Sequence, residues 1–229
     1  MMSMATQEPH LRSHAIEDYA KAIYVLETRG DEPVSTTALA ERLHVTAGSV
    51  SAMIKKLAEL DLVAHTPYRG VRLTPEGRRT ALEVIRHHRL LELFLAEVLE
   101  MPWDRVHQEA EVLEHVLSTE LEEIIAEKLG NPTRDPHGDP IPSAEFEIEE
   151  RETRSLADLQ PGDEGVFVRV SDSEPEMLRY LGDRGVTPGQ SFEVLERQPF
   201  GGPLFVRFGP DVHPLGGELA QAMRVEVPA

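Results

Sequence analysis

The sequence predicts a mainly α-helical protein with a small β domain, and the patterning of three stretches supports this fold class. Residues 14–60 and 75–129 repeat apolar residues at helical spacing. Residues 155–229 alternate apolar and polar residues between Gly and Pro turns, which is typical of short strands. The chain of 229 residues exceeds one ordinary domain, so we expect several small ones.

The first domain, residues 1–74, has the element order of a winged helix-turn-helix. Apolar spacing predicts helices over 14–29, 37–43 and 49–60, followed by strands over 62–65 and 70–73. Ser35 or Thr36 is expected to cap the second helix. In this arrangement the third helix enters the major groove of double-stranded DNA, and the hairpin, or wing, contacts the backbone or the minor groove.

Short helices beside a hairpin also occur in many small α+β modules, so the order of elements alone does not establish DNA binding. The side chains provide further evidence for it. The start of the third helix offers small hydroxyl side chains that can approach phosphates, and Lys and Arg residues follow on the helix and in the wing. The predicted DNA contacts are Thr46, Ser49, Ser51, Lys55, Lys56, Tyr68 and Arg69.

The second domain, residues 75–142, is predicted to be helical and to mediate dimerisation. Thr74 caps a first long helix with Pro75 at its first position, and Asp104 caps a second helix that runs to Gly130. The second helix carries a broad apolar stripe from Val112 to Ile125. Two long helices alone make a thin core, so we expect a homodimer to bury the rest of this stripe.

The remaining residues are predicted to form a linker and a C-terminal β domain. Residues 131–154 are rich in proline and then in charge, which predicts a linker, and we assign 143–154 to the linker proper. Residues 155–229 read as a small β-barrel of SH3-like type with a short helix at 176–181.

The composition limits the classes of function. The net charge is −18, but residues 11–79 hold 10 Lys and Arg against 9 Asp and Glu, whereas residues 80–150 hold 5 against 18. This asymmetry suggests two separate tasks on one chain. The absence of cysteine excludes thiolate metal sites and disulfides. No apolar run is long enough for a membrane span and no signal peptide is recognisable, so we expect a cytoplasmic protein without membrane contact.

Histidines and carboxylates recur at helical spacing in the second domain and predict a metal site. His107, Glu111, Glu114 and His115 share one helix surface, and His88 and Glu92 form a similar pair on the preceding helix. Imidazoles and carboxylates without thiolates suit manganese or ferrous iron. A di-metal hydrolase or oxidase carrying a winged helix is the alternative, but such bundles need two ExxH motifs in a four-helix core.

The order of these motifs resembles the diphtheria toxin repressor family of metal-dependent transcriptional regulators. The resemblance rests on HHRLLE, VHQEAEVLEHVLS and GNPTRDPHGDPIP and extends from about residue 14 to the end of the chain. The resemblance implies a homodimer that binds Mn²⁺ or Fe²⁺ and then a palindromic operator. It also implies a repressor of metal-uptake genes and not an enzyme. It also implies that the C-terminal domain is FeoA-like.

The resemblance further implies two metal sites. The primary site would comprise Asp18, Glu111, Glu114 and His115. The ancillary site would comprise His88, Glu92 and His107, completed from the C-terminal domain by Glu174, with Glu176 or Met177 beside it.

Two substitutions within the implied primary site bear on the choice of metal. Iron-responsive members of the family carry Cys and Met where this chain has Glu111 and Asp18. The carboxylate ligands of this chain are harder than sulfur and favour manganese. The manganese branch carries an additional Glu where this chain has Lys21, which argues against a paired-metal site, and that branch often lacks the C-terminal barrel.

Overall fold

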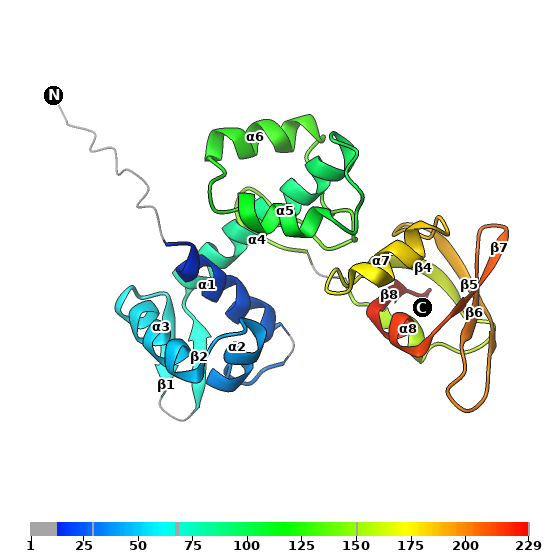
Figure 1. The fold of residues 1–229 in the computed structure, drawn as a ribbon, viewed down its shortest axis with the longest axis horizontal. Helices are drawn as coiled ribbons and strands as arrows, with labels where there is room; N and C mark the ends of the chain where they lie inside the picture. Colours follow the sequence, from blue (N-terminus) through cyan, green and yellow to red (C-terminus); the bar gives the residue numbers. More distant parts are fainter. Residues whose placement is uncertain (1–12, 29, 67–68, 150, 229) are drawn as a thin grey trace. The chain divides into compact units, whose positions relative to one another are not determined.

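The chain forms two compact units, Met1–Ile85 and Arg86–Ala229, in the computed structural model, which describes residues 13–28, 30–66, 69–149 and 151–228. The first unit contains α1 (His14–Glu27), α2 (Thr36–Arg42), α3 (Ala47–Glu59), β1 (Val63–Thr66), β2 (Gly70–Leu73) and the first part of α4 (Pro75–Glu97) (Figure 1). This order confirms the predicted winged helix-turn-helix.

Hydroxyl side chains set the starts of the helices in the first unit. The Ser35 hydroxyl accepts the amide proton of Ala38 at 3.1 Å and caps α2. The Thr46 hydroxyl accepts that of Ser49 at 3.2 Å, so α3 begins at Ala47, two residues earlier than predicted. The Thr74 hydroxyl accepts from Gly77 at 3.0 Å at the start of α4, as predicted.

The hairpin and the apolar helix faces form the core of this unit. β1 and β2 pair antiparallel from Val63 opposite Leu73 to Thr66 opposite Gly70. Val50, Ile54 and Leu57 point from α3 into the core at helical spacing. The opposite face of α3 is therefore left to solvent.

The second unit contains the remainder of α4 with α5 (Val106–Leu113) and α6 (Thr119–Lys128). The prediction of one continuous helix from Asp104 to Gly130 is wrong, because the chain leaves the helical conformation between α5 and α6. Ser118 starts the new helix by accepting the amide proton of Leu121 at 3.3 Å. Asp104 does not cap α5 but pairs with Arg179 at 3.3 Å.

Residues 131–142, read from their composition as part of a linker, are instead packed into the second unit. The Asp135 carboxylate accepts the amide protons of His137 and Asp139, each at 2.9 Å, which closes a tight turn. The side chains of Asp135, His137 and Ile141 are buried. The proline-rich and charged residues of this stretch thus form a loop whose conformation is defined by hydrogen bonds and buried side chains.

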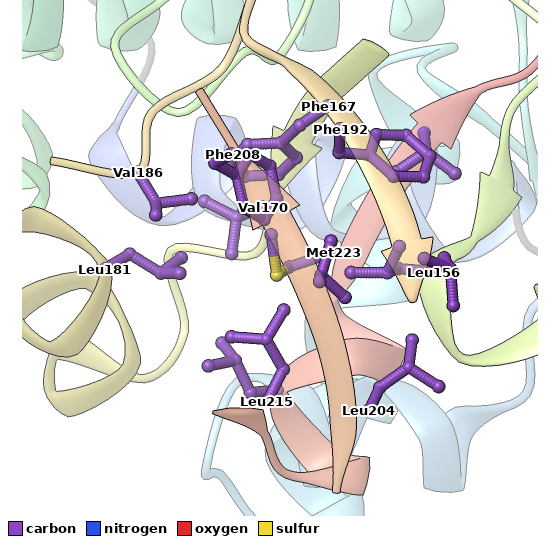
Figure 2. Close-up of a cluster of buried hydrophobic side chains, with 14 of the residues drawn as sticks. Leu156, Phe167, Val170, Leu181, Val186, Phe192, Leu204, Phe208, Leu215 and Met223 are labelled. Atoms are coloured by element: carbon purple, nitrogen blue, oxygen red, sulfur yellow. The ribbon is translucent and has the colours of Figure 1, made fainter. Parts of the chain in front are cut away.

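A six-stranded antiparallel sheet forms the C-terminal part of the second unit, in the order β3-β8-β4-β5-β6-β7. Its elements are β3 (Arg154–Ser155), η1 (Leu156–Asp158), β4 (Glu164–Val170), α7 (Pro175–Gly182), β5 (Ser191–Arg197), β6 (Leu204–Phe208), β7 (Asp211–Leu215), α8 (Gly217–Ala222) and β8 (Met223–Glu226). Figure 2 shows aromatic and aliphatic side chains, among them Phe167, Phe208 and Met223, gathered into one core. The predicted small β domain with a short helix is confirmed.

Close backbone approaches fix the sheet to the helical part of the same unit. Gly138 has a φ of +90°, and a Cβ there would lie 1.9 Å from the carbonyl oxygen of Val168. The amide of Val170 donates to the carbonyl of His137 at 2.9 Å. A Cβ at Gly182 would lie 2.9 Å from the indole nitrogen of Trp103. The turn that follows β4 is thereby held in place.

In the described part of the chain, none of the helices combines the length and apolarity that a membrane span requires.

The packing of α4 against the start of the wing predicts a large effect of Gly77→Ala. The new Cβ would lie 1.9 Å from the carbonyl oxygen of Leu62, so the helix must shift. We expect a loss of about 1–3 kcal/mol in the free energy of unfolding, measured in urea. Gly48→Ala is the control, because its nearest neighbour is 3.8 Å away and alanine favours helix. Equal stability of both variants would contradict the described packing.

Candidate metal centre and DNA-binding face

A buried carboxylate, that of Glu92, lies among three imidazoles in the second unit. α4 presents His88 and Glu92 one turn apart, with side chains only 6% and 1% exposed. Glu92 Oε1 lies 3.0 Å from His88 Nε2 and 3.2 Å from His107 Nδ1, which comes from α5. The rings of His88 and His107 meet edge to face at 4.8 Å between centroids. The three residues predicted for the ancillary site are thus together.

The C-terminal part of the unit supplies Asp172, which the sequence interpretation missed. Asp172 Oδ2 lies 2.9 Å from His107 Nδ1. His88, Glu92, His107 and Asp172, called the Glu92 cluster below, each offer one ligand atom within 4.8 Å of the others. The predicted Glu174 is exposed at the start of α7, and neither it nor Glu176 belongs to the groups of possible ligands found among the described residues.

A second missed pair, Asp135 and His137, lies on the other side of Glu92. His137 is fully buried, and its Nε2 lies 2.8 Å from the carbonyl oxygen of Trp103. Its Nδ1 has no hydrogen-bond partner and lies 3.7 Å from Glu92 Oε2. Burial, and then the charges of Asp139 and Glu92, raise the pKa of Asp135 well above its usual range. Both residues belong to the GNPTRDPHGDPIP motif, which was the available signal.

The predicted primary-site residues of the second unit lie at the end of α5. Glu114 is buried, His115 is half-buried, and Glu111 is exposed. These three residues are called the Glu114 cluster below. Glu114 Oε1 lies 3.6 Å from His115 Nε2, and its Oε2 contacts His88 Nδ1. The fourth predicted ligand, Asp18, is half-buried on α1 of the first unit.

A buried network supports the break in the helix that carries the Glu114 cluster. His87 Nδ1 lies 3.1 Å from the carbonyl oxygen of Glu114, and His87 Nε2 lies 3.0 Å from Glu122 Oε2 on α6. Arg86 also pairs with Glu122 and donates to the carbonyl of Pro142 at 2.7 Å. The backbone of Glu114 is thus tied to α4 and, through it, to α6.

The candidate DNA face of the first unit is exposed. All predicted contacts on α3 are exposed, from its cap to its last turn: Thr46, Ser49, Ser51, Lys55 and Lys56. The Ser51 hydroxyl donates to the carbonyl of Ala47 at 2.9 Å, which leaves its oxygen able to accept. Arg69 is exposed in the wing, and Tyr68 lies outside the described residues.

Comparison with known sequences matches three domain families along the chain. The iron dependent repressor N-terminal DNA-binding domain matches residues 12–71, the iron dependent repressor metal binding and dimerisation domain matches 74–143, and the FeoA domain matches 154–227. The iron-dependent repressor IdeR of Mycobacterium tuberculosis is 33% identical over 222 residues, which cover 92% of this chain and 96% of that protein. The chain belongs to the iron-dependent, or diphtheria toxin, repressor family.

Two further relatives are a diphtheria toxin repressor and a repressor whose name gives manganese as its metal. The diphtheria toxin repressor of Corynebacterium efficiens is 33% identical over 221 residues, 92% of this chain and 94% of that protein. The structure of a manganese-dependent transcriptional repressor in complex with manganese is 43% identical, with a TM-score of 0.84 over 93% of this chain and 100% of that one. These relatives are transcriptional repressors, so the enzyme alternative has no support.

The ionisable groups of this repressor's Glu92 cluster shift one another's pKa. Desolvation would raise the pKa of Glu92, but the charge of His88, the hydrogen bonds with His107 and His88 and the nearby His137 ring hold it well below its usual range. Hydrogen bonds with Asp172 and then Glu92 raise the pKa of His107 to about 10. Burial lowers the pKa of His137, but the nearby carboxylate of Glu92, with the charge of Asp135, brings it to about 9. Protons on the imidazoles therefore compensate the buried carboxylate.

Asp172→Asn is expected to lower the pKa of His107 from about 10 toward its ordinary 6.5, because it removes the largest cause of the shift. In the metal-free wild type the pair stabilises the fold fully below pH 6.5, and this contribution is lost as the pH rises through about 10. NMR titration of the His107 ring and unfolding between pH 6 and 10 measure both effects. Glu174→Gln is the control and leaves them unchanged; an equal effect of both variants would contradict the Asp172 contact.

Proposed function

We propose that this repressor-family protein is activated by manganese, acts in the cytoplasm and represses metal-uptake genes by binding a palindromic operator as a homodimer. The observation that carries the proposal is the Glu92 cluster, in which imidazole nitrogens and carboxylate oxygens converge from α4, α5 and the turn after β4. Such a set without sulfur suits Mn²⁺ or Fe²⁺. The manganese-bound relative at 43% identity supports the choice of manganese.

The proposed ancillary site consists of the Glu92 cluster, with Asp172 in the role that the sequence interpretation gave to Glu174. Asp172 is held against His107, whereas the Glu174 side chain is exposed. Asp135 and His137 are further candidate donors, because both face Glu92 and His137 Nδ1 has no hydrogen bond. A buried group of this kind needs positive charge, from protons or from a cation.

The proposed primary site consists of Asp18 on α1 with the Glu114 cluster. Three carboxylates brought together repel one another unless positive charge compensates them. A bound divalent cation supplies that charge and favours the conformation in which Asp18, on the DNA-binding unit, is fastened to α5. The spacing of the two recognition helices of the dimer then matches successive turns of the operator.

The exposed apolar residues of α5, α6 and the segment between them support the homodimer. Val112 and Val116 are 69% and 66% exposed, and Leu121 and Ile124 are 47% and 56% exposed. Exposed aliphatic residues on two consecutive helices and on the segment between them favour association through this part of the chain. A second copy of the chain is the proposed partner, because the matched domain family combines metal binding with dimerisation.

An electrophoretic shift assay on the protein's own upstream region, with Mn²⁺ or with anaerobic Fe²⁺, tests this function. We expect Mn²⁺ to induce binding and a chelator to abolish it. If Fe²⁺ alone induced DNA binding, iron would replace manganese in the proposal. DNA binding that is independent of both metals would refute the proposed metal dependence.

Asp18→Ala is expected to abolish metal-dependent operator binding while the fold and the dimer survive. The substitution removes the only proposed ligand on the DNA-binding unit, so a bound cation no longer favours the active conformation. The shift assay reports DNA binding, and sedimentation and circular dichroism report the dimer and the fold. Unchanged activation would exclude Asp18 as the fastening ligand.

Lys56→Ala and Arg69→Ala are expected to weaken binding to operator and random DNA alike, because both residues are proposed to neutralise phosphates. Each substitution should make the negative slope of log K for DNA binding against log salt concentration less steep, by about one for each phosphate that is no longer neutralised. Arg207→Ala, which removes a charge from β6 of the C-terminal sheet, is the control and keeps the slope. A variant with the wild-type slope identifies a residue that does not touch phosphate.

A further inference from the structure

The ring of His87 holds the backbone of a candidate ligand without being one. His87 is buried on α4 and belongs to none of the groups of possible ligands found among the described residues. Its Nδ1 lies 3.1 Å from the carbonyl oxygen of Glu114, the residue at which α5 ends. We propose that His87 is a positioning residue that sets the affinity of the Glu114 cluster for a cation. The proposal rests on the proposed primary site and adds a residue outside its ligand set.

The hydrogen bond from His87 replaces one that α5 gives up at its end. In a continuous helix the carbonyl oxygen of Glu114 would accept the amide proton of residue 118. Ser118 instead lies outside α5 and caps α6. Glu114 is buried, and a buried carbonyl group needs a donor. A carbonyl oxygen only accepts hydrogen bonds, so the Nδ1–H group of His87 is the donor.

The surroundings of His87 keep its ring in one orientation. Its Nε2 lies 3.0 Å from Glu122 Oε2 on α6. Arg86 pairs with the same carboxylate and donates to the carbonyl of Pro142 at 2.7 Å. The side chains of His87, Arg86 and Glu122 are only 10–11% exposed, so water hardly competes for these contacts. The ring is therefore a fixed point on α4 against which α5 ends.

Two ligands of the Glu114 cluster extend from the backbone that His87 holds. Glu114 supplies a carboxylate, and its carbonyl group is part of the peptide bond to His115. Glu114 Oε1 lies 3.6 Å from His115 Nε2, so the two side chains already face one another. Outer partners that orient metal ligands typically change metal affinity by about 10–100-fold when they are removed. Loss of the bond from His87 should weaken the Glu114 cluster by a factor in this range.

Two substitutions separate the two nitrogens of His87. An asparagine amide occupies the position of Nδ1 and can donate to the carbonyl of Glu114, but it does not reach Glu122. A glutamine amide reaches the position of Nε2 and can bond to Glu122, but it places no donor at Nδ1. Each variant loses one buried hydrogen bond, so a purely structural role of His87 predicts similar effects of both. A positioning role predicts that only His87→Gln lowers the affinity for the cation.

The test is a set of Mn²⁺ binding isotherms on the full chain, with free Mn²⁺ measured by electron paramagnetic resonance. The Asp172→Asn background weakens the Glu92 cluster, so that binding by the Glu114 cluster is measured. The Asp18→Asn background weakens the Glu114 cluster and reports binding by the Glu92 cluster. Unfolding in urea and sedimentation measure the stability and the dimer of each variant.

The His87 variants give the deciding results. In the Asp172→Asn background we expect His87→Gln to lower the Mn²⁺ affinity by about tenfold or more, and His87→Asn to retain it. In the Asp18→Asn background both variants should bind Mn²⁺ as the chain with His87 does. Equal affinities of the two variants, or an equal loss in both backgrounds, would overturn the positioning role.

Two further outcomes are separable from these. If His87→Gln does not fold, His87→Asn decides: retained Mn²⁺ affinity supports the donor at Nδ1, and a loss of about tenfold overturns it. If Asp172→Asn binds Mn²⁺ no more tightly than the double variant with Asp18→Asn, the proposed primary site itself is refuted, and the role of His87 with it.

Discussion

The burial of the Glu92 carboxylate is the constraint on which the second unit depends. A carboxylate with 1% of its side chain exposed has lost its hydration, and only nearby positive charge can offset this loss. The structure provides three imidazoles around it, from His88, His107 and His137. Each of these rings can carry a proton, or lose it to solvent and offer the freed nitrogen to a cation. The same geometry is therefore compatible with a protonated apo state and with a metal-bound one, and acid competes with the metal.

This constraint also explains why residues from distant parts of the chain must be held so firmly. His137 comes from a loop whose Gly138 approaches the backbone of β4 too closely for any side chain. Asp172 follows the same strand by two residues. A displacement of the sheet would remove Asp172 from His107 and, with it, part of the charge that balances the imidazoles. Packing of the C-terminal sheet and the electrostatics of the cluster thus depend on each other.

The sequence predicts the parts of this centre that follow from local geometry. His88 and Glu92, and likewise His107 and Glu111, are four residues apart, and helical periodicity places each pair on one face. Asp172 and His137 come from loops, where residue spacing carries no such information, and they reach Glu92 only through tertiary packing. The sequence interpretation missed the break between α5 and α6, because the helical spacing of apolar residues continues through the break. The only local signal was Ser118, which caps α6 but lies within this helix-like pattern.

The acidity of the chain is less of an obstacle to DNA binding than the net charge of −18 implies. Several carboxylates of the strongly acidic stretch 80–150 are buried: Glu92, Glu114, Glu122 and Asp135. Arg86 and His87 compensate Glu122, and imidazoles compensate Glu92 and Glu114. Burial raises the pKa of Asp135 well above its usual range, which favours its neutral form. These groups therefore contribute little to the potential at the surface. The proposed cation sites lie among these same carboxylates. A cation at these proposed sites would add positive charge where the chain is most acidic, and it would reduce the repulsion between the protein and phosphate in the same step that, in our proposal, favours the DNA-binding conformation.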